Sequence, residues 1–97
     1  MREIYEKIIE FRDERGWKPY HNGKDLAISI SLESNELLEN FQWRSSEEAV
    51  KESKQNIKEE MADILIYLIQ MADVLEIDLE EEVLQKLKKN AVKYPAE

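Results

Sequence analysis

The sequence predicts an all-α protein, an antiparallel four-helix bundle, and three observations support this fold class. The chain has 97 residues, which fits one small domain over residues 1–97. It contains two glycines and two prolines, and 37% of its residues are charged, which is typical of a helical protein. Apolar residues recur at a 3.6-residue period along most of the chain, and no segment alternates as a strand does.

Two helices are predicted in the first half of the chain. Apolar residues repeat at helical spacing up to the first glycine, which predicts a helix over residues 2–15. Residues 16–23 hold both glycines and one proline, so they form a connection. The period then resumes and predicts a helix over residues 24–42, with Asn22 or Asp25 as its N-cap.

The second half begins with a polar stretch and continues with two more helices. Residues 44–55 include the capping-box pattern of Ser45 and Glu48, which indicates a short helix or a loop. A strong apolar repeat over residues 57–75 predicts the core helix. The last helix is expected over residues 79–93.

The centre of the predicted core helix is apolar on nearly every side. Two or three neighbouring helices of so small a chain cannot cover such a surface. We therefore expect part of this helix to pack against another subunit, in a homo-oligomer that is a dimer or a tetramer.

The composition excludes several classes of function. Twenty-two acidic and fourteen basic residues give a net charge of −8, which disfavours binding to a nucleic acid polymer or an anionic membrane. Without cysteine, disulfides and cysteine nucleophiles are excluded. The N-terminus does not resemble a signal peptide, and the longest apolar run is far shorter than the roughly 20 residues that span a bilayer. We expect a cytoplasmic protein without a membrane partner.

Two pairs of carboxylates lie in the predicted helices. The pairs are Glu33-x-x-Glu36 and Glu60-x-x-Asp63. A three-residue step places both members of a pair on one face of a helix, and either pair alone is most often a solvated face. Both pairs, however, lie in helices that need burial, where clustered carboxylates must bind a cation or take up protons. Oxygen ligands favour Mg²⁺ or Mn²⁺, whereas a di-iron bundle would need Glu-x-x-His motifs, and the one histidine, His21, lies in a connection.

The order and spacing of these motifs resemble the signature of the all-α nucleoside triphosphate pyrophosphohydrolases, the MazG-like superfamily. Twenty-three residues separate the two acidic pairs. The resemblance covers residues 17–95 and is greatest to the dCTP pyrophosphatase branch, on the segments Phe41–Trp43, Glu59–Leu68 and Lys86–Pro95. It implies a single MazG-like domain that assembles as a homo-oligomer.

The resemblance also implies an activity that depends on Mg²⁺, with Mn²⁺ as a substitute. In that superfamily, water attacks the α-phosphorus of a nucleoside triphosphate and produces the monophosphate and pyrophosphate. For this chain the implied substrate is dCTP or a modified pyrimidine analogue, and the implied role is cleansing of the nucleotide pool. The implied metal ligands are Glu33, Glu36, Glu60 and Asp63, and Glu33 is the implied general base.

A set of substrate-binding residues follows from the same resemblance. Those expected at the base and sugar, from one subunit or several, are Trp17, His21 and Trp43, and those expected near the triphosphate are Tyr67, Lys86, Asn90, Lys93 and Tyr94. Other interpretations remain open: the tryptophans could fill a core or an oligomer contact, and the lysines could suit the negative end of a helix dipole.

Two alternative functions also remain. A related enzyme could prefer dUTP or accept many triphosphates, because base choice depends on a few pocket contacts. Alternatively, the protein could be a non-enzymatic oligomeric helical interaction module whose acids are merely solvated.

Overall fold

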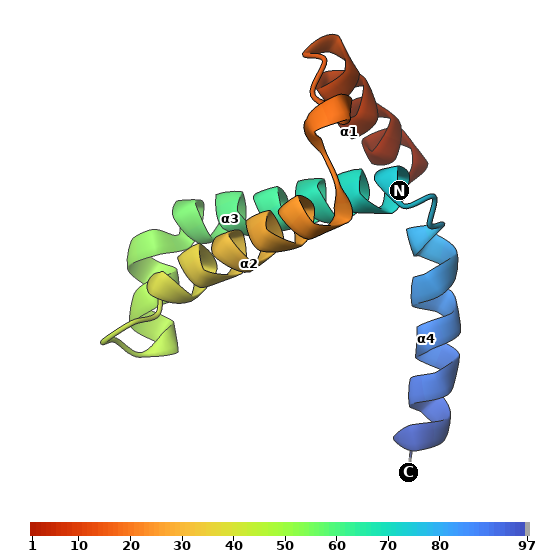
Figure 1. The fold of residues 1–97 in the computed structure, drawn as a ribbon. Helices are drawn as coiled ribbons and strands as arrows, with labels where there is room; N and C mark the ends of the chain where they lie inside the picture. The colour runs from red at the N-terminus through yellow and green to blue at the C-terminus, as the bar shows by residue number, and fades with distance from the viewer. Residues whose placement is uncertain (97) are drawn as a thin grey trace.

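The structure is a computed structural model that describes residues 1–96, and these residues contain helices and no strand (Figure 1). The predicted all-α class is therefore confirmed. The helices are α1 (Arg2–Glu14), the short 3₁₀ helix η1 (Lys18–Tyr20), α2 (Gly23–Glu39), α3 (Ser46–Val74) and α4 (Leu79–Lys93).

Side chains cap the N-termini of α2, α3 and α4, as the sequence predicts. In each cap, a side-chain oxygen accepts a hydrogen bond from the backbone N–H three residues later. The pairs are Asn22 with Asp25 at 2.8 Å, Ser45 with Glu48 at 3.1 Å, and Asp78 with Glu81 at 3.1 Å. Gly16 follows α1 with a φ of +63°, a left-handed conformation that glycine adopts without strain.

Two boundaries differ from the prediction. Helix α2 ends at Glu39, three residues earlier than predicted, because Asn40 caps it. The polar stretch that was expected to form a short helix or a loop is helical and belongs to α3 (Ser46–Val74), which a kink divides into a short first segment and a long second one. Lysine, glutamate and glutamine are good helix formers, so this stretch stays helical despite its lack of apolar residues. A kink at Ser53 (φ −125°, ψ 22°) marks where the two predicted segments join.

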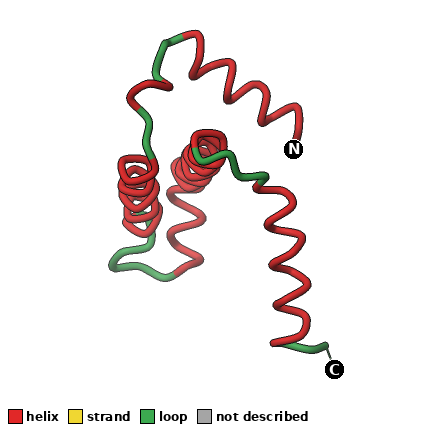
Figure 2. The backbone as a smooth tube through the Cα atoms, turned by 45° about the vertical axis from the view of Figure 1, so that its right-hand side comes forward, coloured by secondary structure: helices red, strands yellow, loops and turns green. Residues whose placement is uncertain are grey.

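Helices α2 and α3 run antiparallel, side by side, at the centre of the molecule (Figures 1 and 2). Helix α1 crosses α3 near the C-terminal end of α3. Among the described residues, four apolar side chains are fully buried, and two of them are alanines, so the core has little volume: Leu26, Ala49, Ile69 and Ala72.

A buried arginine fastens α1 to α3. The side chain of Arg12 is 1% exposed, and its Nη1 donates a hydrogen bond to Asp73 Oδ2 at 2.7 Å. Tyr5 Oη donates to the other oxygen of Asp73 at 3.0 Å. Burial alone would raise the pKa of Asp73, but the hydrogen bonds from Arg12 and Tyr5 lower it below its ordinary value.

Helix α4 extends away from the other helices, so one chain does not close the predicted four-helix bundle (Figure 2). Its apolar face remains uncovered, since Leu84 is 51% exposed and Leu87 is 58% exposed. The radius of gyration is 16.1 Å, whereas a compact chain of this length would have about 12.5 Å. The all-α class and the helices are confirmed, whereas α4 lies apart from α2 and α3 in one chain, so the bundle in its predicted homo-oligomeric form stays a prediction.

A groove of about 1070 Å³ lies between α1, the end of α3 and the start of α4. Apolar side chains form much of its lining, among them Leu65, Leu68 and Val83. None of the helices in residues 1–96 combines the length and the apolar character that crossing a membrane requires.

Candidate functional site

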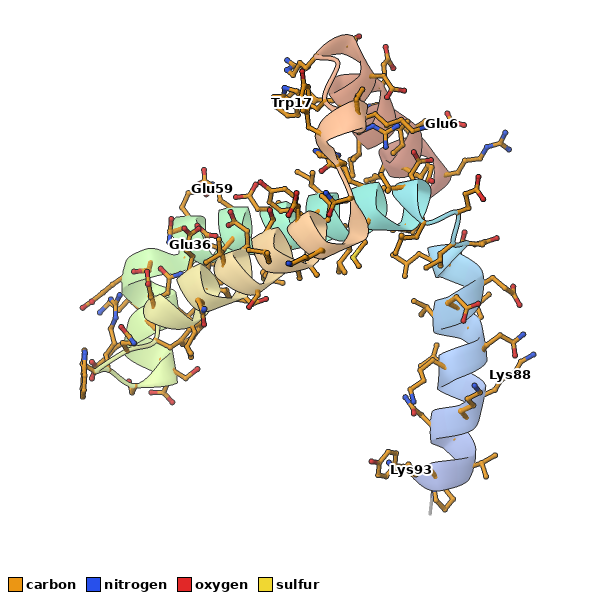
Figure 3. The ribbon with its side chains drawn as sticks, viewed as in Figure 1. Glu6, Trp17, Glu36, Glu59, Lys88 and Lys93 are labelled. Atoms are coloured by element: carbon orange, nitrogen blue, oxygen red, sulfur yellow. The ribbon has the colours of Figure 1, made fainter. Side chains whose placement is uncertain are left out.

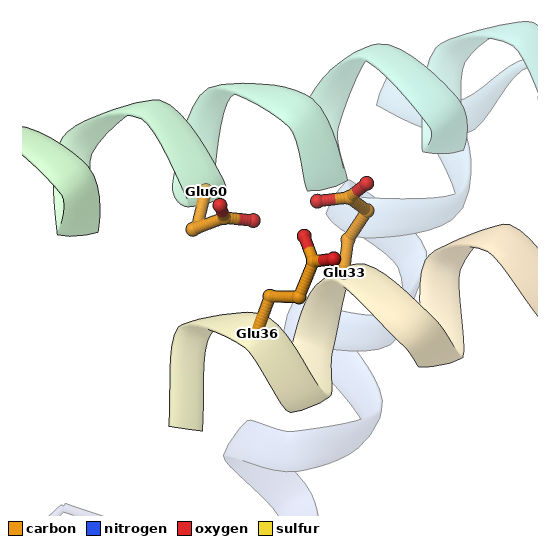
Figure 4. A group of neighbouring side chains, drawn as sticks. All are labelled: Glu33, Glu36 and Glu60. Carbon is orange, nitrogen blue, oxygen red and sulfur yellow. The ribbon is translucent and has the colours of Figure 1, made fainter. Parts of the chain in front are cut away.

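Three of the four predicted metal ligands meet between α2 and α3. Glu33 and Glu36 project from successive turns of α2, and Glu60 projects from α3 towards them (Figure 4). Each offers one carboxylate oxygen, and these oxygens all lie within 4.8 Å of one another. The antiparallel pairing of the two helices therefore turns two sequence-distant acidic motifs into one cluster, which we call the carboxylate cluster.

The carboxylate cluster is partly withdrawn from water. Glu33 and Glu60 are half-buried, and Glu36 is exposed. The pKa of Glu33 is raised to about 8, first by hydrogen bonding with Glu60, then by burial, and then by Glu36. Without a cation, the cluster therefore keeps a proton at neutral pH, because three adjacent negative charges repel one another.

Asp63 and Tyr67 lie beside the carboxylate cluster. Asp63 is half-buried and follows Glu60 by one turn of α3, but it falls outside the group of mutually close oxygens. The pKa of Tyr67 is raised by burial and then by the charges of Glu33 and Asp63. The structure thus places Tyr67 near the acids and leaves Asp63 at the edge of the cluster, while the predicted contact of Tyr67 with the substrate stays a prediction.

The donor set of the carboxylate cluster fits a divalent cation. Oε2 of Glu33 and Oε2 of Glu60 are buried and have no hydrogen-bond partner among the described residues. Buried polar atoms normally have a hydrogen-bond partner, so we expect these two oxygens to bind a cation or a proton. An all-oxygen site suits Mg²⁺ or Mn²⁺ better than softer metals.

The residues predicted at the base and sugar do not gather around this cluster. Trp17 packs edge-on against Phe11 of α1, with ring centroids 5.8 Å apart, and lies well away from Glu36 (Figure 3). His21 is half-buried at the end of η1, and its Nδ1 has no hydrogen-bond partner within residues 1–96. Burial and then Arg12 lower the pKa of His21, which favours a neutral imidazole.

Trp43 is almost fully exposed to solvent. It lies in the turn between α2 and α3, is 99% exposed, and has a φ of +63°. A non-glycine residue with positive φ is strained, and a tryptophan in open solvent buries none of its apolar surface. The next residue, Arg44, holds the turn by donating hydrogen bonds to Glu52 at 2.9 Å and to Ser53 Oγ at 3.1 Å.

The residues predicted near the triphosphate on α4 are remote from the carboxylates in one chain. These residues are Lys86, Asn90 and Lys93, with Tyr94 at the C-cap. Figure 3 shows Lys93 near the far end of α4, away from Glu36 on α2. A single chain therefore brings the acids and Tyr67 together, but not the cationic and aromatic residues.

Sequence reasoning missed two asparagines at the end of the site. Asn40 is 6% exposed and accepts a hydrogen bond from Asn56 of α3 at 2.9 Å. A signal was available, because each asparagine lies one helical turn from an acid of the predicted motif: Asn40 follows Glu36 by four residues, and Asn56 precedes Glu60 by four.

Comparisons with known proteins agree on one family. Residues 28–97 match the family model described as the MazG-like family. Two curated relatives are both named dCTP pyrophosphatase 1: that of Bos taurus is 36% identical over 100 residues, and that of Homo sapiens is 35% identical over 101 residues. The matches cover 98% and 99% of this chain, which spans about 59% of the length of each relative.

A solved structure shares both sequence and fold with this chain. It is the crystal structure of a pyrophosphatase from Archaeoglobus fulgidus, which is 50% identical and superposes with a TM-score of 0.90. The match covers 99% of this chain and 93% of that chain. The arrangement of the four helices, with α4 included, is therefore that of a known protein.

Proposed function

This chain belongs to the MazG-like family, and on that premise we propose that it is a nucleoside triphosphate pyrophosphatase. The observation that carries the proposal is the carboxylate cluster, where three acids meet and two of their oxygens lack a partner. Acids without a ligand would be placed apart or in water, because mutual repulsion disfavours such a cluster.

We assign the binding of a divalent cation, Mg²⁺ or Mn²⁺, to Glu33, Glu36 and Glu60, with Asp63 as the fourth ligand. When bound, the cation neutralises phosphate charge and makes a water molecule more acidic. Glu33 is the proton acceptor in this proposal, because its half-buried carboxyl group lies between Glu36 and Glu60 and one of its oxygens has no hydrogen-bond partner among the described residues. Tyr67 would donate a hydrogen bond beside the acids.

The proposed substrate is dCTP or a modified pyrimidine analogue, hydrolysed to the monophosphate and pyrophosphate. Two relatives carry the name dCTP pyrophosphatase 1, and each matches nearly the whole of this chain. The proposed role is the removal of unwanted nucleotides from the pool. The broad or dUTP-type alternative differs only in the base, so the same assay decides between them.

We propose further that the site is completed by a second copy of the chain in a homo-oligomer. Trp43 is almost fully exposed, and α4 extends away from α2 and α3, with Lys86, Asn90, Lys93 and Tyr94 in its second half or at its C-cap. Cations and amide donors are the groups that triphosphate oxygens require, and an aromatic ring can stack on a base. An α4 helix and a Trp43 side chain from neighbouring copies would supply both.

The test is release of pyrophosphate from a panel of dCTP, 5-methyl-dCTP, dUTP, dTTP, dATP, dGTP and ribonucleotides, with Mg²⁺ and with EDTA. We expect release that requires the cation and is fastest for a cytosine nucleotide. Fast release from dUTP, or equal release from all, would replace the dCTP assignment with the alternative specificity.

A folded sample that releases no pyrophosphate with any nucleotide would contradict the enzyme and favour the interaction module. Under that alternative, Mg²⁺ would change neither the melting temperature nor any binding. A rise in melting temperature with Mg²⁺ therefore counts against the module independently of turnover.

A further inference from the structure

Two asparagines form a polar link between α2 and α3 at one end of the carboxylate cluster. Asn56 Nδ2 donates a hydrogen bond to Asn40 Oδ1 at 2.9 Å. Asn40 is 6% exposed and Asn56 is exposed, so the accepting end of this bond is buried, and loss of the donor would leave a buried amide oxygen without its partner. This bond joins the C-cap of α2 directly to α3, beside the place where Glu33 and Glu60 meet across the same two helices.

The amide orientation of Asn40 is determined by its own helix. Its Nδ2 donates to the backbone oxygen of Glu36 at 3.2 Å and to that of Leu37 at 3.3 Å. The amide oxygen must therefore face α3, where Asn56 supplies the donor. A chain of hydrogen bonds thus runs from the backbone of a cluster residue on α2 to a residue on α3.

The position of this link along the two helices matches the position of the carboxylates. Asn56 and Glu60 are four residues apart, as are Glu36 and Asn40, so in both helices the asparagine and the acid lie on one face. The kink at Ser53 lies about one turn before Asn56, so the regular segment of α3 that carries Asn56 and Glu60 begins after it. The link therefore joins the C-terminal end of α2 to the first regular turn of α3 after the kink, one turn before Glu60.

We propose that Asn40 and Asn56 are positioning residues, which hold Glu36 and Glu60 at the separation that a divalent cation requires. The proposal rests on the cation binding described above. Repulsion between the carboxylates favours movement of α2 away from α3 or along it. Apolar contacts have no preferred direction, so they oppose such a shift only weakly. A directional bond one turn away opposes this motion before any cation arrives, which is preorganisation of the site.

The experiment measures Mn²⁺ affinity by calorimetry, without nucleotide, on the wild-type chain and on Asn56→Leu. Leucine has a similar size but donates no hydrogen bond. We expect Asn56→Leu to weaken Mn²⁺ binding by about 10- to 100-fold, the range that supporting residues of metal sites typically show. The matched control is Gln55→Leu, the neighbouring exposed residue, which should bind Mn²⁺ within about two-fold of wild type.

Thermal melting of the metal-free variants separates positioning from a purely structural role. A structural role would lower the melting temperature of Asn56→Leu but leave its Mn²⁺ affinity unchanged at temperatures where it is folded. Asn56→Ser, which keeps a shorter donor, replaces Asn56→Leu if the latter does not fold, and should also bind Mn²⁺ more weakly. If wild type binds Mn²⁺ and the variant binds it equally well, the positioning role is overturned and the proposed function stands. If wild type binds no Mn²⁺, both fail.

Discussion

Glu33 behaves differently from the other glutamates because its carboxyl group shares its surroundings with two more. Its pKa is raised from about 4.5 to about 8 in the metal-free protein. Between these two pH values the folded chain binds a proton that the unfolded chain has lost. The free energy of unfolding therefore falls as pH rises from about 4.5 to about 8, because the unfolded state binds fewer protons in this window.

This pH dependence can be measured as melting temperature in EDTA. We expect wild type to lose stability between pH 5 and pH 8, and Glu33→Gln to lose less over the same range. Carboxylates outside the cluster titrate in both proteins, so the difference between the two curves reports the proton that the cluster holds when Glu33 is present. Parallel curves would show that Glu33 has an ordinary pKa. Saturating Mg²⁺ should also flatten the wild-type curve, because the cation takes the place of the proton.

The acids of α2 provide a matched pair for a test of turnover. Glu36 belongs to the carboxylate cluster, whereas Glu39 continues the same acidic stripe but is exposed and outside the cluster. We expect Glu36→Gln to lower the rate of pyrophosphate release by at least about 100-fold and Glu39→Gln to change it by less than about three-fold. Equal effects of the two substitutions would contradict the ligand assignment.

At the residue scale, site residues that form a repeated motif can be predicted from the sequence, whereas single residues outside any motif cannot. Two acidic pairs at a three-residue spacing signal a common face, and three of their four members do meet in space. The asparagine link has no such pattern, since an asparagine beside a helix end is most often only a cap. Its second role depends on the register of α2 against α3, which a single sequence does not contain.

At the element scale, the attachment of α1 depends on one buried ion pair. Asp73 accepts hydrogen bonds from Arg12 and Tyr5 of α1, and the guanidinium group of Arg12 is almost completely buried. The carboxyl group of Asp73 has a lowered pKa, although burial alone would raise it, because the hydrogen bonds from Arg12 and Tyr5 stabilise the charged form. The stability that it contributes is present above the ordinary pKa of aspartate and is lost as pH falls through the lowered value.

We expect Asp73→Ala to reduce the free energy of unfolding by about 3 kcal/mol, because it leaves a buried guanidinium with one partner fewer. Urea denaturation at a fixed protein concentration measures this loss. Glu59→Ala, an exposed acid on the same helix, is the control and should change the free energy by less than about 0.5 kcal/mol. A loss below about 1 kcal/mol for Asp73→Ala would mean that water reaches Arg12.

The ends of the helices are well predicted where they depend on local chemistry. Asn22, Ser45 and Asp78 cap their helices through hydrogen bonds that span three residues, so the sequence contains all the information needed. The placement of α4 is different. Its apolar face predicts burial, but the partner of that face is absent from the same chain, so the pattern cannot say where α4 lies.

At the scale of the whole molecule, the uncovered apolar surface predicts assembly. Val83 and Leu84 of α4 line the large groove beside α1 and α3, and both are exposed. We expect sedimentation to show a dimer or a tetramer of the 11.5 kDa chain. Leu84→Glu should shift the protein towards smaller species and abolish pyrophosphate release, while Lys88→Glu on the same helix should keep the assembly. A wild-type protein that is monomeric and fully active would contradict both the predicted assembly and its role in pyrophosphate release.

The small core has a thermodynamic consequence for how the protein must be handled. Four fully buried apolar side chains provide little of the free energy that ordering 97 residues requires. If most apolar burial occurs between chains, folding and association are one equilibrium, and its constant has units of concentration. Dilution then acts as a denaturant. The melting temperature should rise with the logarithm of protein concentration, and in the cell the amount of protein made would itself set the fraction that is folded.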